Sequence, residues 1–260
     1  MILRRLGNKK RIAHKILPHF PAHKIYIEPF FGAGGMFFSK PKAKYNIVND
    51  LDSDVFNLFQ VVMNQKEELE KAFYMMPIHS DLLEYWKTNK EQEPIRKALR
   101  FLTLSNFTYL GKGDIIKYGV ESHGKNSFSK NLDKCFEAIY NVQFINKDFV
   151  EVLNSFQIKD AENYFIYCDP PYLSTGDNYS DSFTEEQTTT LFKTLIDTSC
   201  KFAVSEFDNP VILDLAKQHN LEVITIGERC NLKNRRTEIL VVNYESPALY
   251  GLFGSNNVRG

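Results

Sequence analysis

Residues 25–50 of the chain read IYIEPFFGAGGMFFSKPKAKYNIVND, and this stretch decides the fold. Its two ends, 25–28 and 45–48, are short runs rich in β-branched and aromatic residues, a composition that favours strands. Between them lie a tight glycine loop, FGAGG, and enough residues for a short helix. Strand, glycine loop, helix and strand make half of a dinucleotide-type α/β unit, so the stretch predicts a sheet of that kind.

The chain after residue 140 repeats this alternation. Its patterns predict helices from 149, over 184–196 and over 210–219, and strands near 143–145, 164–168, 202–204, 222–226 and 237–243. Strands that alternate with helices form a mostly parallel, doubly wound sheet. The predicted fold class is therefore α/β, with a Rossmann-like sheet.

The segment 55–140 interrupts the alternation. Helical apolar spacing runs from residue 52 to about 104, and no strand pattern intervenes. Residues 105–132 are rich in Gly, Asn, Ser, Lys and aromatic residues, which predicts a loop or β-hairpin region. We therefore expect a mostly helical inserted module at 55–140, a main domain built from 1–54 and 141–243, and a loosely attached tail at 244–260.

The composition narrows the class of protein. With 260 residues and 43% hydrophobic content, the chain can bury a substantial core. No stretch approaches the ~20 apolar residues of a membrane span, and the start lacks the apolar segment of a signal peptide, so a cytoplasmic protein without a membrane partner is expected. The four cysteines are widely scattered and no ligand cluster has metal spacing, which predicts reduced, structural thiols and no metal.

Charge is balanced overall but unevenly placed. The formal net charge is zero, which argues against an indiscriminate polyanion binder. Basic residues nevertheless gather in three segments, at 4–15, 112–134 and 229–236. Each alone is best explained as a solvated face, but the three together permit a nucleic-acid groove.

The glycine loop and a downstream acid indicate a nucleotide-type ligand. Gly32 and Gly34 remove side chains beside Phe31, where a ligand must approach the backbone. Asp50 follows the next strand, where its carboxylate can accept both hydroxyls of a ribose. Because no Lys follows the loop as it does in phosphate-binding loops, an adenosine without a pyrophosphate fits better, and S-adenosyl-L-methionine is the expected cofactor.

The run YFIYC at 164–168 leads directly into Asp169, Pro170, Pro171 and Tyr172. A carboxylate oxygen of Asp169 and the Pro170 carbonyl can each accept one hydrogen of a planar amino group, while the Tyr172 ring stacks on the base that carries it. The two prolines hold these acceptors stiffly. A plain strand-terminating turn is the alternative explanation for this tetrapeptide.

These motifs, taken in order, resemble those of the Dam-type (D12 class, α-group) DNA adenine-N6 methyltransferases. The segments that carry the resemblance are GNKK at 7–10, EPFFGAG at 28–34, ND at 49–50, KDF at 147–149, DPPY at 169–172 and FT at 183–184. They span most of the chain outside 55–140 and the tail. The resemblance implies a methyltransferase sheet at 1–54 and 141–243 and a target-recognition domain at 55–140.

The resemblance also implies roles for single residues. Arg5 and Lys9 would be amino-terminal cofactor contacts, although the family commonly has an aromatic residue at the position of Arg5. Asp148 would meet the adenine of the cofactor. Asp169 would serve both catalysis and cofactor binding, with Pro170 and Tyr172 completing the catalytic segment.

DNA contacts are expected outside the cofactor motifs. The inserted module offers Asn106, Tyr109 and Lys112, which combine base-edge hydrogen bonding, stacking and phosphate contact. Tyr179 resembles part of a segment that closes over a flipped base, and Arg235 and Arg236 can hold phosphates. Relatives that read GATC use an arginine in this region. Because residues 101–135 contain none, the resemblance implies sequence-specific methylation but does not extend to GATC.

The expected activity is methyl transfer from S-adenosylmethionine to adenine N6 of a base flipped out of double-stranded DNA. Accepting both amino hydrogens with Asp169 and Pro170 favours a pyramidal, more nucleophilic nitrogen. Cytosine-N4 or RNA adenine methylation is the alternative, since the tetrapeptide recognises an amino group rather than one base. A non-catalytic nucleic-acid-binding subunit and a nicotinamide-dependent oxidoreductase are further alternatives. A cognate restriction endonuclease is a candidate partner.

Overall fold

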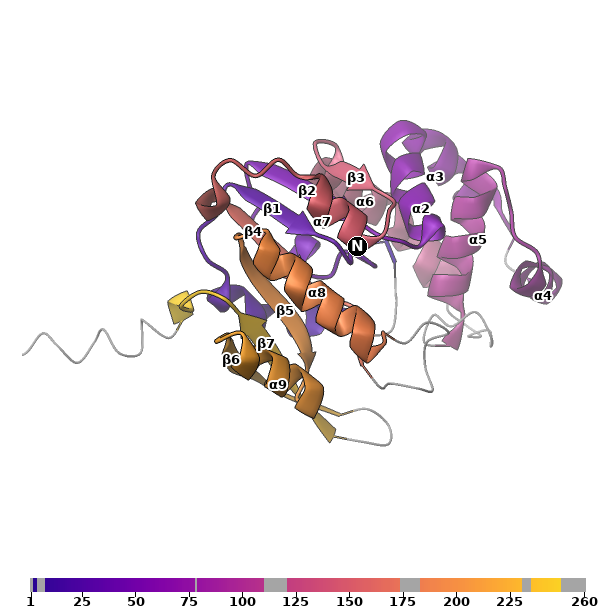
Figure 1. Cartoon of the computed structure of the whole chain (residues 1–260). Coiled ribbons are helices and arrows are strands. Elements are labelled where there is room, and N and C mark those ends of the chain that lie inside the picture. Colours follow the sequence, from indigo (N-terminus) through magenta and orange to yellow (C-terminus); the bar gives the residue numbers. More distant parts are fainter. Residues whose placement is uncertain are drawn as a thin grey trace, which may run out of the picture. The chain divides into compact units, whose positions relative to one another are not determined.

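The computed structural model describes residues 2–3, 8–77, 79–109, 121–173, 183–230 and 235–248 (Figure 1). Seven strands form one mixed sheet in the order β3-β2-β1-β4-β5-β7-β6. The strands are β1 (Ile25–Glu28), β2 (Tyr45–Asn49), β3 (Gln143–Ile145), β4 (Tyr164–Cys168), β5 (Lys201–Phe207), β6 (Glu222–Cys230) and β7 (Arg235–Val242). The predicted α/β class and every predicted strand are confirmed, with ends that differ by a few residues.

Parallel pairing brings the carboxyl ends of four strands to one edge of the sheet. Strand β1 runs parallel to β2 and β4, and β4 runs parallel to β5. Strand β7 inserts antiparallel between β5 and β6, which places Glu238 opposite Phe207 at the end of β5. Asp169 follows Cys168, the last residue of β4, so it emerges at this same edge.

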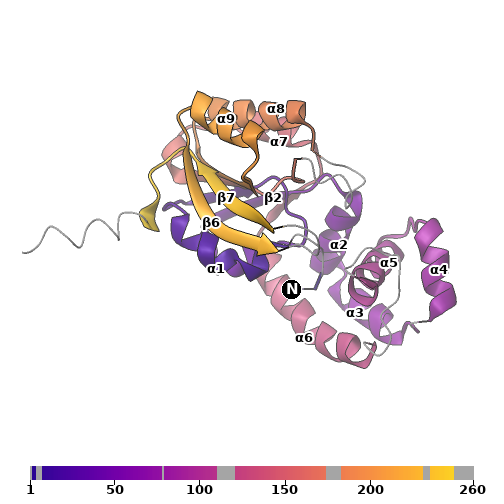
Figure 2. The same ribbon diagram turned by 90° about the horizontal axis from the view of Figure 1, so that it is seen from below.

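Helices cover both faces of this sheet. Helices α7 (Phe149–Ser155), α8 (Glu185–Asp197) and α9 (Pro210–Gln218) lie on one side, and the short α1 (Ala13–Ile16) lies on the other (Figure 2). The α7–α9 side is apolar, with Ile166, Val204 and Val241 from the strands packed among buried helix residues. On the opposite face, the ring of Phe20 after α1 lies 4.6 Å from that of Phe165.

Local sequence explains where α8 and α9 begin. Thr184 caps α8 by accepting from the Gln187 amide, and the Gln187 side chain accepts from the Thr184 amide, which forms a capping box. Asn209 caps α9 through the Val211 amide, and Pro210 occupies the first helical position. Side-chain caps therefore fix the first residues of both helices.

Helices fill most of the chain between residues 53 and 139. They are α2 (Ser53–Asn64), α3 (Lys66–Met75), α4 (Ser80–Thr88), α5 (Pro94–Phe107) and α6 (Glu121–Ile139). The loop or hairpin expected over 105–132 is wrong for 105–107 and 121–132, which are helical. Phe128, Leu132, Cys135 and Ile139 are buried at spacings of three and four residues, so burial of one face outweighs the polar composition of α6.

The described residues also contain 3-10 helices at Lys9–Arg11, Phe37–Ser39 and Ala161–Asn163, and another at Leu17–His19 continues α1. The short helix expected after the glycine loop is the 3-10 turn at Phe37–Ser39. In the part of the chain that the structure describes, no helix is both long and apolar enough to cross a bilayer.

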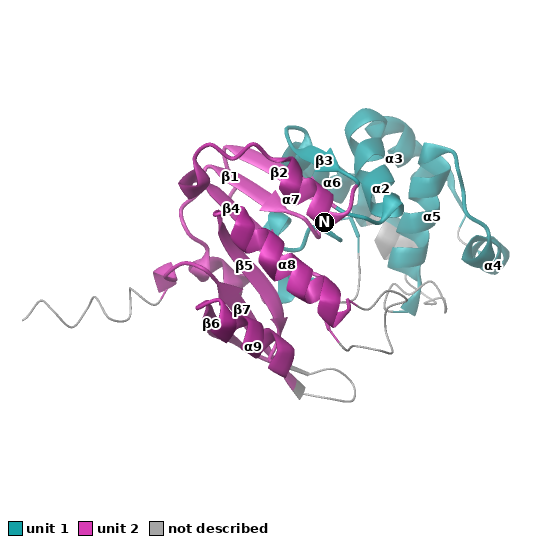
Figure 3. Cartoon of the chain, viewed as in Figure 1, with its two compact units in different colours: residues 1–11, 31–39, 50–146 teal, residues 12–30, 40–49, 147–260 magenta. Residues whose placement is uncertain are grey.

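The chain divides into two compact units (Figure 3). Unit 1 comprises residues 1–11, 31–39 and 50–146, and unit 2 comprises residues 12–30, 40–49 and 147–260. This division differs from the domain boundaries expected from sequence, because the amino-terminal segment and the glycine loop group with the helices α2–α6. Asp50 belongs to unit 1 and Asp169 to unit 2, and each group of residues is described within its own unit.

Candidate active site

The glycine loop of unit 1 has the backbone that its sequence requires. Gly32 and Gly34 have φ values of 53° and 70°, in the left-handed region that favours glycine. A Cβ atom at Gly34 would lie 2.6 Å from Cε2 of Phe38, so a side chain there is sterically excluded. A Cβ at Gly32 would meet no atom within 4 Å, so the loop presents bare backbone to open space at this position.

Asp50 holds the glycine loop in place. Its Oδ2 accepts a hydrogen bond from the Gly32 amide at 2.5 Å, and its Oδ1 accepts from the Asp52 amide at 2.9 Å. A carboxylate oxygen can accept more than one hydrogen bond, which is the property that the expected ribose contact requires. The hydrogen bond from Gly32 thus also fixes the position of the Asp50 carboxylate, which is the expected ribose ligand.

Lys9 lies beside this loop. Its side chain is only 2% exposed, and the segment 8–9 contacts Gly35, where a Cβ would lie 2.1 Å from Oδ1 of Asn8 and 3.0 Å from the Lys9 nitrogen. An ammonium group at such a buried position requires polar partners. Arg5, the other expected amino-terminal contact, lies outside the described residues.

Phe31 contributes to the core rather than to an open surface. Its ring is 3% exposed and lies 5.0 Å from the ring of Phe59 and 5.4 Å from that of Phe144. Its carbonyl accepts from the Gly34 amide at 2.8 Å. Any contact of Phe31 with a cofactor therefore has to come from its backbone.

In unit 2, the Asp-Pro-Pro-Tyr segment follows β4 as expected. Asp169 is half-buried, Pro170 is buried, and Pro171 and Tyr172 are partly exposed. The Tyr172 hydroxyl donates to Oε1 of Glu238 at 2.7 Å. Burial, together with the negative charges of Asp169 and Glu238, raises the pKa of Tyr172 well above its usual value, so its hydroxyl stays protonated and donates.

Two buried glutamates, which the sequence analysis missed, support this segment. Glu238 is 1% exposed and its Oε1 also accepts from the Ser205 hydroxyl at 2.7 Å. Glu206 is 2% exposed and accepts from the Phe207 amide at 2.8 Å and from the Leu173 amide at 3.3 Å. The available signal was an acid within an otherwise apolar strand, since a carboxylate at such a position needs buried donors.

Another acid lies at the carboxyl end of β1. Glu28 is 2% exposed and its Oε2 accepts from the Tyr26 hydroxyl at 2.7 Å. Lys40 lies over the Tyr26 ring, with Nζ 4.0 Å from the centroid. Burial lowers the pKa of Lys40 to about 8, and the nearby charge of Glu28 offsets part of that decrease.

Cys168 precedes the Asp-Pro-Pro-Tyr segment but is a poor nucleophile. Burial raises the pKa of its thiol well above the usual value, and the charges of Glu28 and Asp169 add to the increase. A protonated, fully buried thiol is unreactive, which agrees with the structural role expected for the cysteines.

Asp148 is exposed at the amino terminus of α7, where Oδ1 accepts from the Val150 amide at 2.9 Å. This N-cap bond fixes the carboxylate at the start of α7. The preceding residue, Lys147, is held by Asn49. The Asn49 amide donates to the carbonyls of Pro29 (2.9 Å) and Lys147 (3.0 Å), and so connects the ends of β1 and β2 to this segment.

The expected DNA contacts are only partly described. The Asn106 amide donates to the carbonyls of Ile2 and Leu102, both at 3.0 Å, and Tyr109 is 53% exposed. The guanidinium carbon of Arg236 lies 5.4 Å from the centroid of the Phe207 ring. Lys112, Tyr179 and the side chain of Arg235 lie outside the described residues.

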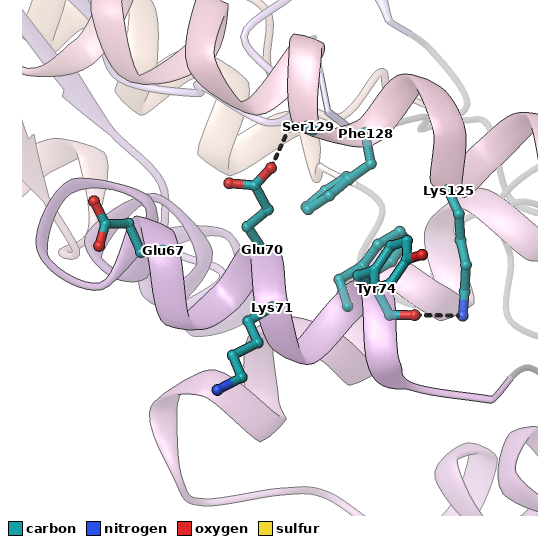
Figure 4. Close-up of a pocket in the computed structure, with 8 residues that line it drawn as sticks. Glu67, Glu70, Lys71, Tyr74, Lys125, Phe128 and Ser129 are labelled. Atoms are coloured by element: carbon teal, nitrogen blue, oxygen red, sulfur yellow. Dashed lines mark hydrogen bonds between the residues drawn. The ribbon is translucent and has the colours of Figure 1, made fainter.

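A surface hollow of about 270 Å³ lies between α3 and α6 of unit 1 (Figure 4). Its lining includes Glu70, Tyr74 and Lys125, and Glu70 accepts a hydrogen bond from Ser129 across it. None of the residues expected to bind cofactor or base lines this hollow, and we do not assign it to the cofactor. Among the described residues, no group of three or more His, Cys, Asp or Glu side chains is arranged to hold a metal ion.

The doubly wound sheet, the glycine loop tied to Asp50 and the Asp-Pro-Pro-Tyr segment after β4 define the class of methyltransferases that act on amino groups. The family model of the D12 class N6 adenine-specific DNA methyltransferases matches residues 6–230. The chain therefore belongs to this family, as the resemblance of its motifs implied.

Individual relatives agree with the family. The DNA adenine methylase of Escherichia coli (strain K12) is 25% identical over 240 residues, which cover 85% of each chain. The Retron Ec67 DNA adenine methylase of Escherichia coli is 27% identical over 93% of this chain and 90% of its own length. The type II methyltransferase M1.LlaDCHI of Lactococcus lactis subsp. cremoris is 24% identical over 88% and 92%. Among solved structures, the N-terminal domain of human METTL16 in complex with SAH is 10% identical over 92% of this chain and 68% of that chain, with a TM-score of 0.39.

The chain is thus an adenine-specific DNA methyltransferase that transfers a methyl group from S-adenosylmethionine to adenine N6. The comparisons do not favour the alternatives of cytosine-N4 or RNA methylation, a non-catalytic subunit or an oxidoreductase. The residues of unit 1 fit the cofactor, since open space beside Gly32, the carboxylate of Asp50 and the buried Lys9 suit an adenosine that carries an amino-acid group.

Proposed function

We propose that the enzyme methylates an adenine that is rotated out of a specific sequence in double-stranded DNA, and that Asp169, Pro170 and Tyr172 receive this base. The observation that carries the proposal is the position of Asp169 and Pro170 at the carboxyl end of β4, followed by a tyrosine that is held by a buried glutamate. In open α/β sheets, ligands bind outside the carboxyl ends of the strands.

Asp169 and Pro170 act on the amino group. Each offers an oxygen to one N6 hydrogen, which favours a pyramidal nitrogen whose lone pair is less delocalised into the ring. When bound, S-adenosylmethionine supplies a methyl group that its sulfonium makes electrophilic. Asp169 then stabilises the positive charge that develops on N6 and accepts the proton that this nitrogen loses.

Tyr172 receives the face of the base. An adenine inside a duplex cannot reach a protein pocket, and its extrusion costs a few kcal/mol, which stacking on an aromatic ring offsets. Tyr172 as a residue is partly exposed, and its hydroxyl donates to the buried Glu238, so the proposal needs only a face of the ring to meet the base.

We propose that Gly32, Gly34, Asp50 and Lys9 bind the cofactor, with Arg5, Asp148 and the Phe31 backbone as further contacts. The loop geometry and the burial of Lys9 support the first four. The carboxylate of Asp148 lies at a helix amino terminus, where it can accept from the amino group of the cofactor's adenine.

The helices α2–α6 and the segments between them serve as the target-recognition domain in this proposal. Asn106, Tyr109 and Lys112 would contact the DNA there, with Tyr179, Arg235 and Arg236 contributing from elsewhere in the chain. The exposure of Tyr109 supports its role, whereas the Asn106 amide already bonds to backbone carbonyls and would offer only its remaining capacity. Because a relative is named a type II methyltransferase, a cognate restriction endonuclease is the proposed partner. We also propose a cytoplasmic location for the enzyme.

The test is nucleoside mass spectrometry after incubation of the enzyme with S-adenosylmethionine and either duplex DNA, single-stranded DNA or RNA. N6-methyladenine in duplex DNA is the expected product, and modification restricted to RNA or to cytosine would contradict the proposal. Mapping of methylated positions in genomic DNA from cells that express the enzyme would then give the recognition sequence. Methylation spread over all adenines would contradict sequence specificity.

A further inference from the structure

We propose that Glu238 is a positioning residue that sets the orientation of the Tyr172 ring for the flipped adenine through the Tyr172 hydroxyl. This inference rests on the proposed function, since it assigns a purpose to the orientation of a ring that stacks on the base. It adds Glu238 of strand β7, 66 residues further along the chain, to the residues that support the Asp-Pro-Pro-Tyr segment.

The first argument is the hydrogen bonding of Glu238. The side chain is 1% exposed, and its Oε1 accepts from both Tyr172 and Ser205 at 2.7 Å. Hydrogen bonds to a charged acceptor in a buried setting are stronger than those between neutral groups. The Tyr172 hydroxyl is therefore fixed by a group that is itself buried within strand β7.

The second argument is the packing of the ring. The Tyr172 ring lies edge-on to the Phe207 ring, with centroids 4.4 Å apart and an interplanar angle of 76°. Phe207 pairs directly with Glu238 in the β5–β7 register. The hydroxyl anchor and the aromatic contact thus come from neighbouring residues of two adjacent strands, and together they limit rotation of the ring about its own axis.

The third argument is that the backbone of the segment cannot orient the Tyr172 ring by itself. The terminal torsion of a tyrosine is broad, so a proline-fixed backbone alone does not determine the plane of the ring. The backbone after Tyr172 is held separately, by the bond from the Leu173 amide to Glu206. Glu206 thereby fixes the chain and Glu238 fixes the ring.

The test is a double-mutant cycle of Tyr172→Phe and Glu238→Gln in the full-length enzyme with duplex DNA. Tyr172→Phe keeps the ring and removes the hydroxyl, whereas Glu238→Gln keeps the shape of the anchor and removes its charge. We expect each change to lower kcat about tenfold, the scale of one hydrogen bond to a charged group, with little change in the Kd for S-adenosylmethionine. The double variant should be no slower than the slower single variant.

Ser205→Ala is the matched control, because it removes the other donor to the same oxygen without touching the ring. It should lower the melting temperature but leave kcat within about twofold of the wild type. A kcat for Ser205→Ala as low as that of Glu238→Gln would overturn the proposal, since Glu238 would then act through the stability of the sheet alone.

Independent, multiplicative losses in the double variant would also overturn it. If Glu238→Gln does not fold, Tyr172→Phe alone still decides: full kcat in that variant means that the hydroxyl anchor is unnecessary. These results are distinct from failure of the proposed function, in which the wild-type enzyme forms no N6-methyladenine in duplex DNA.

Discussion

The glycine loop of unit 1 and the catalytic segment of unit 2 are both short motifs that follow a strand, but they are held in different ways. The loop is fixed by Asp50, only 18 residues away, through a bond to the Gly32 amide. The segment 169–173 is fixed by Glu206 and Glu238, which lie 33 and 66 residues from the groups that they bind. A motif whose hydrogen-bond partner lies close in sequence can be recognised from the sequence. Partners that come from distant strands are found only in the folded structure.

The largest effect is expected when Asp169 is replaced and the two glutamates that hold the segment 169–173 are left unchanged. Asp169→Ala removes the acceptor for the amino group and for the lost proton, and should lower methyl transfer at least about 100-fold. Radiolabelled methyl incorporation into duplex DNA measures this loss. The fold should persist, because Glu206 and Glu238 still hold the segment, and circular dichroism checks it.

Asp214→Ala, on the exposed face of α9, is the matched control for loss of a carboxylate and should keep full activity. Retained turnover in Asp169→Ala would contradict the role of Asp169.

Two substitutions in the glycine loop distinguish the effect of a side chain on the stability of the loop from its effect on cofactor binding. Gly34→Ala places a Cβ against the Phe38 ring at a φ of 70°, so it should lower the free energy of unfolding by about 1–3 kcal/mol. Gly32→Ala has similar backbone strain but no clash, so its loss of stability should be smaller. Chemical denaturation measures both values.

For cofactor affinity we expect the opposite order of the two variants, once each Kd is corrected for the fraction of unfolded protein. A Cβ at Gly32 points into the open space where we expect the cofactor, so Gly32→Ala should weaken the binding of S-adenosylmethionine more than Gly34→Ala does. Calorimetric titration with S-adenosylmethionine measures this, and unchanged affinity in Gly32→Ala would argue against a ligand at that face of the loop.

A smaller effect is expected when the local support of the loop is weakened. Asp50→Asn leaves one strong acceptor where the wild type has two, so either the Gly32 amide or a ribose hydroxyl loses its partner. We expect the Kd for S-adenosylmethionine to rise about tenfold with kcat nearly unchanged. A change confined to kcat would show that Asp50 acts on the chemical step rather than on binding.

The smallest expected effect is a pH dependence of the free energy of unfolding that comes from Lys40, which lies near Glu28. The native pKa of Lys40 is about 8, below the ordinary value of 10.5, because burial disfavours its charged form. Between these two values the unfolded chain binds more protons than the native protein, so Lys40 makes stability rise as the pH increases from about 8 to about 10. Below pH 8 its unfavourable contribution is fully present.

Lys40→Met should therefore flatten the increase in melting temperature over that pH range, and the difference from the wild type isolates the contribution of Lys40. An identical pH profile in the two proteins would mean that Lys40 titrates as an exposed lysine does.

Sequence reasoning worked where a pattern is local. The strands were found because apolar runs end at glycine, proline or acidic residues, and the Asp-Pro-Pro-Tyr segment follows β4 directly. It failed for α6, where buried Phe128 and Leu132 are separated by serine, asparagine and lysine and the helical period is hidden in a polar composition. Glu238 was missed because its partners, Tyr172 and Ser205, are brought to it only by the pairing of β5 with β7.

Sequence patterns also gave no warning of how two expected contacts are used. The Asn106 amide is bonded to the carbonyls of Ile2 and Leu102, and Phe31 is a core ring. Both residues have types suited to ligands, yet only three-dimensional packing decides whether such a side chain turns inward. Residue type therefore constrains the candidates, and burial selects among them.

Arg236 and Glu238 are two positions apart on β7, so both side chains emerge on the same face of the sheet and meet the Phe207–Tyr172 aromatic pair, one over Phe207 and the other at the Tyr172 hydroxyl. If Arg236 holds a DNA phosphate and Glu238 positions Tyr172, as proposed, substitutions on this face of β7 will change DNA affinity and turnover together.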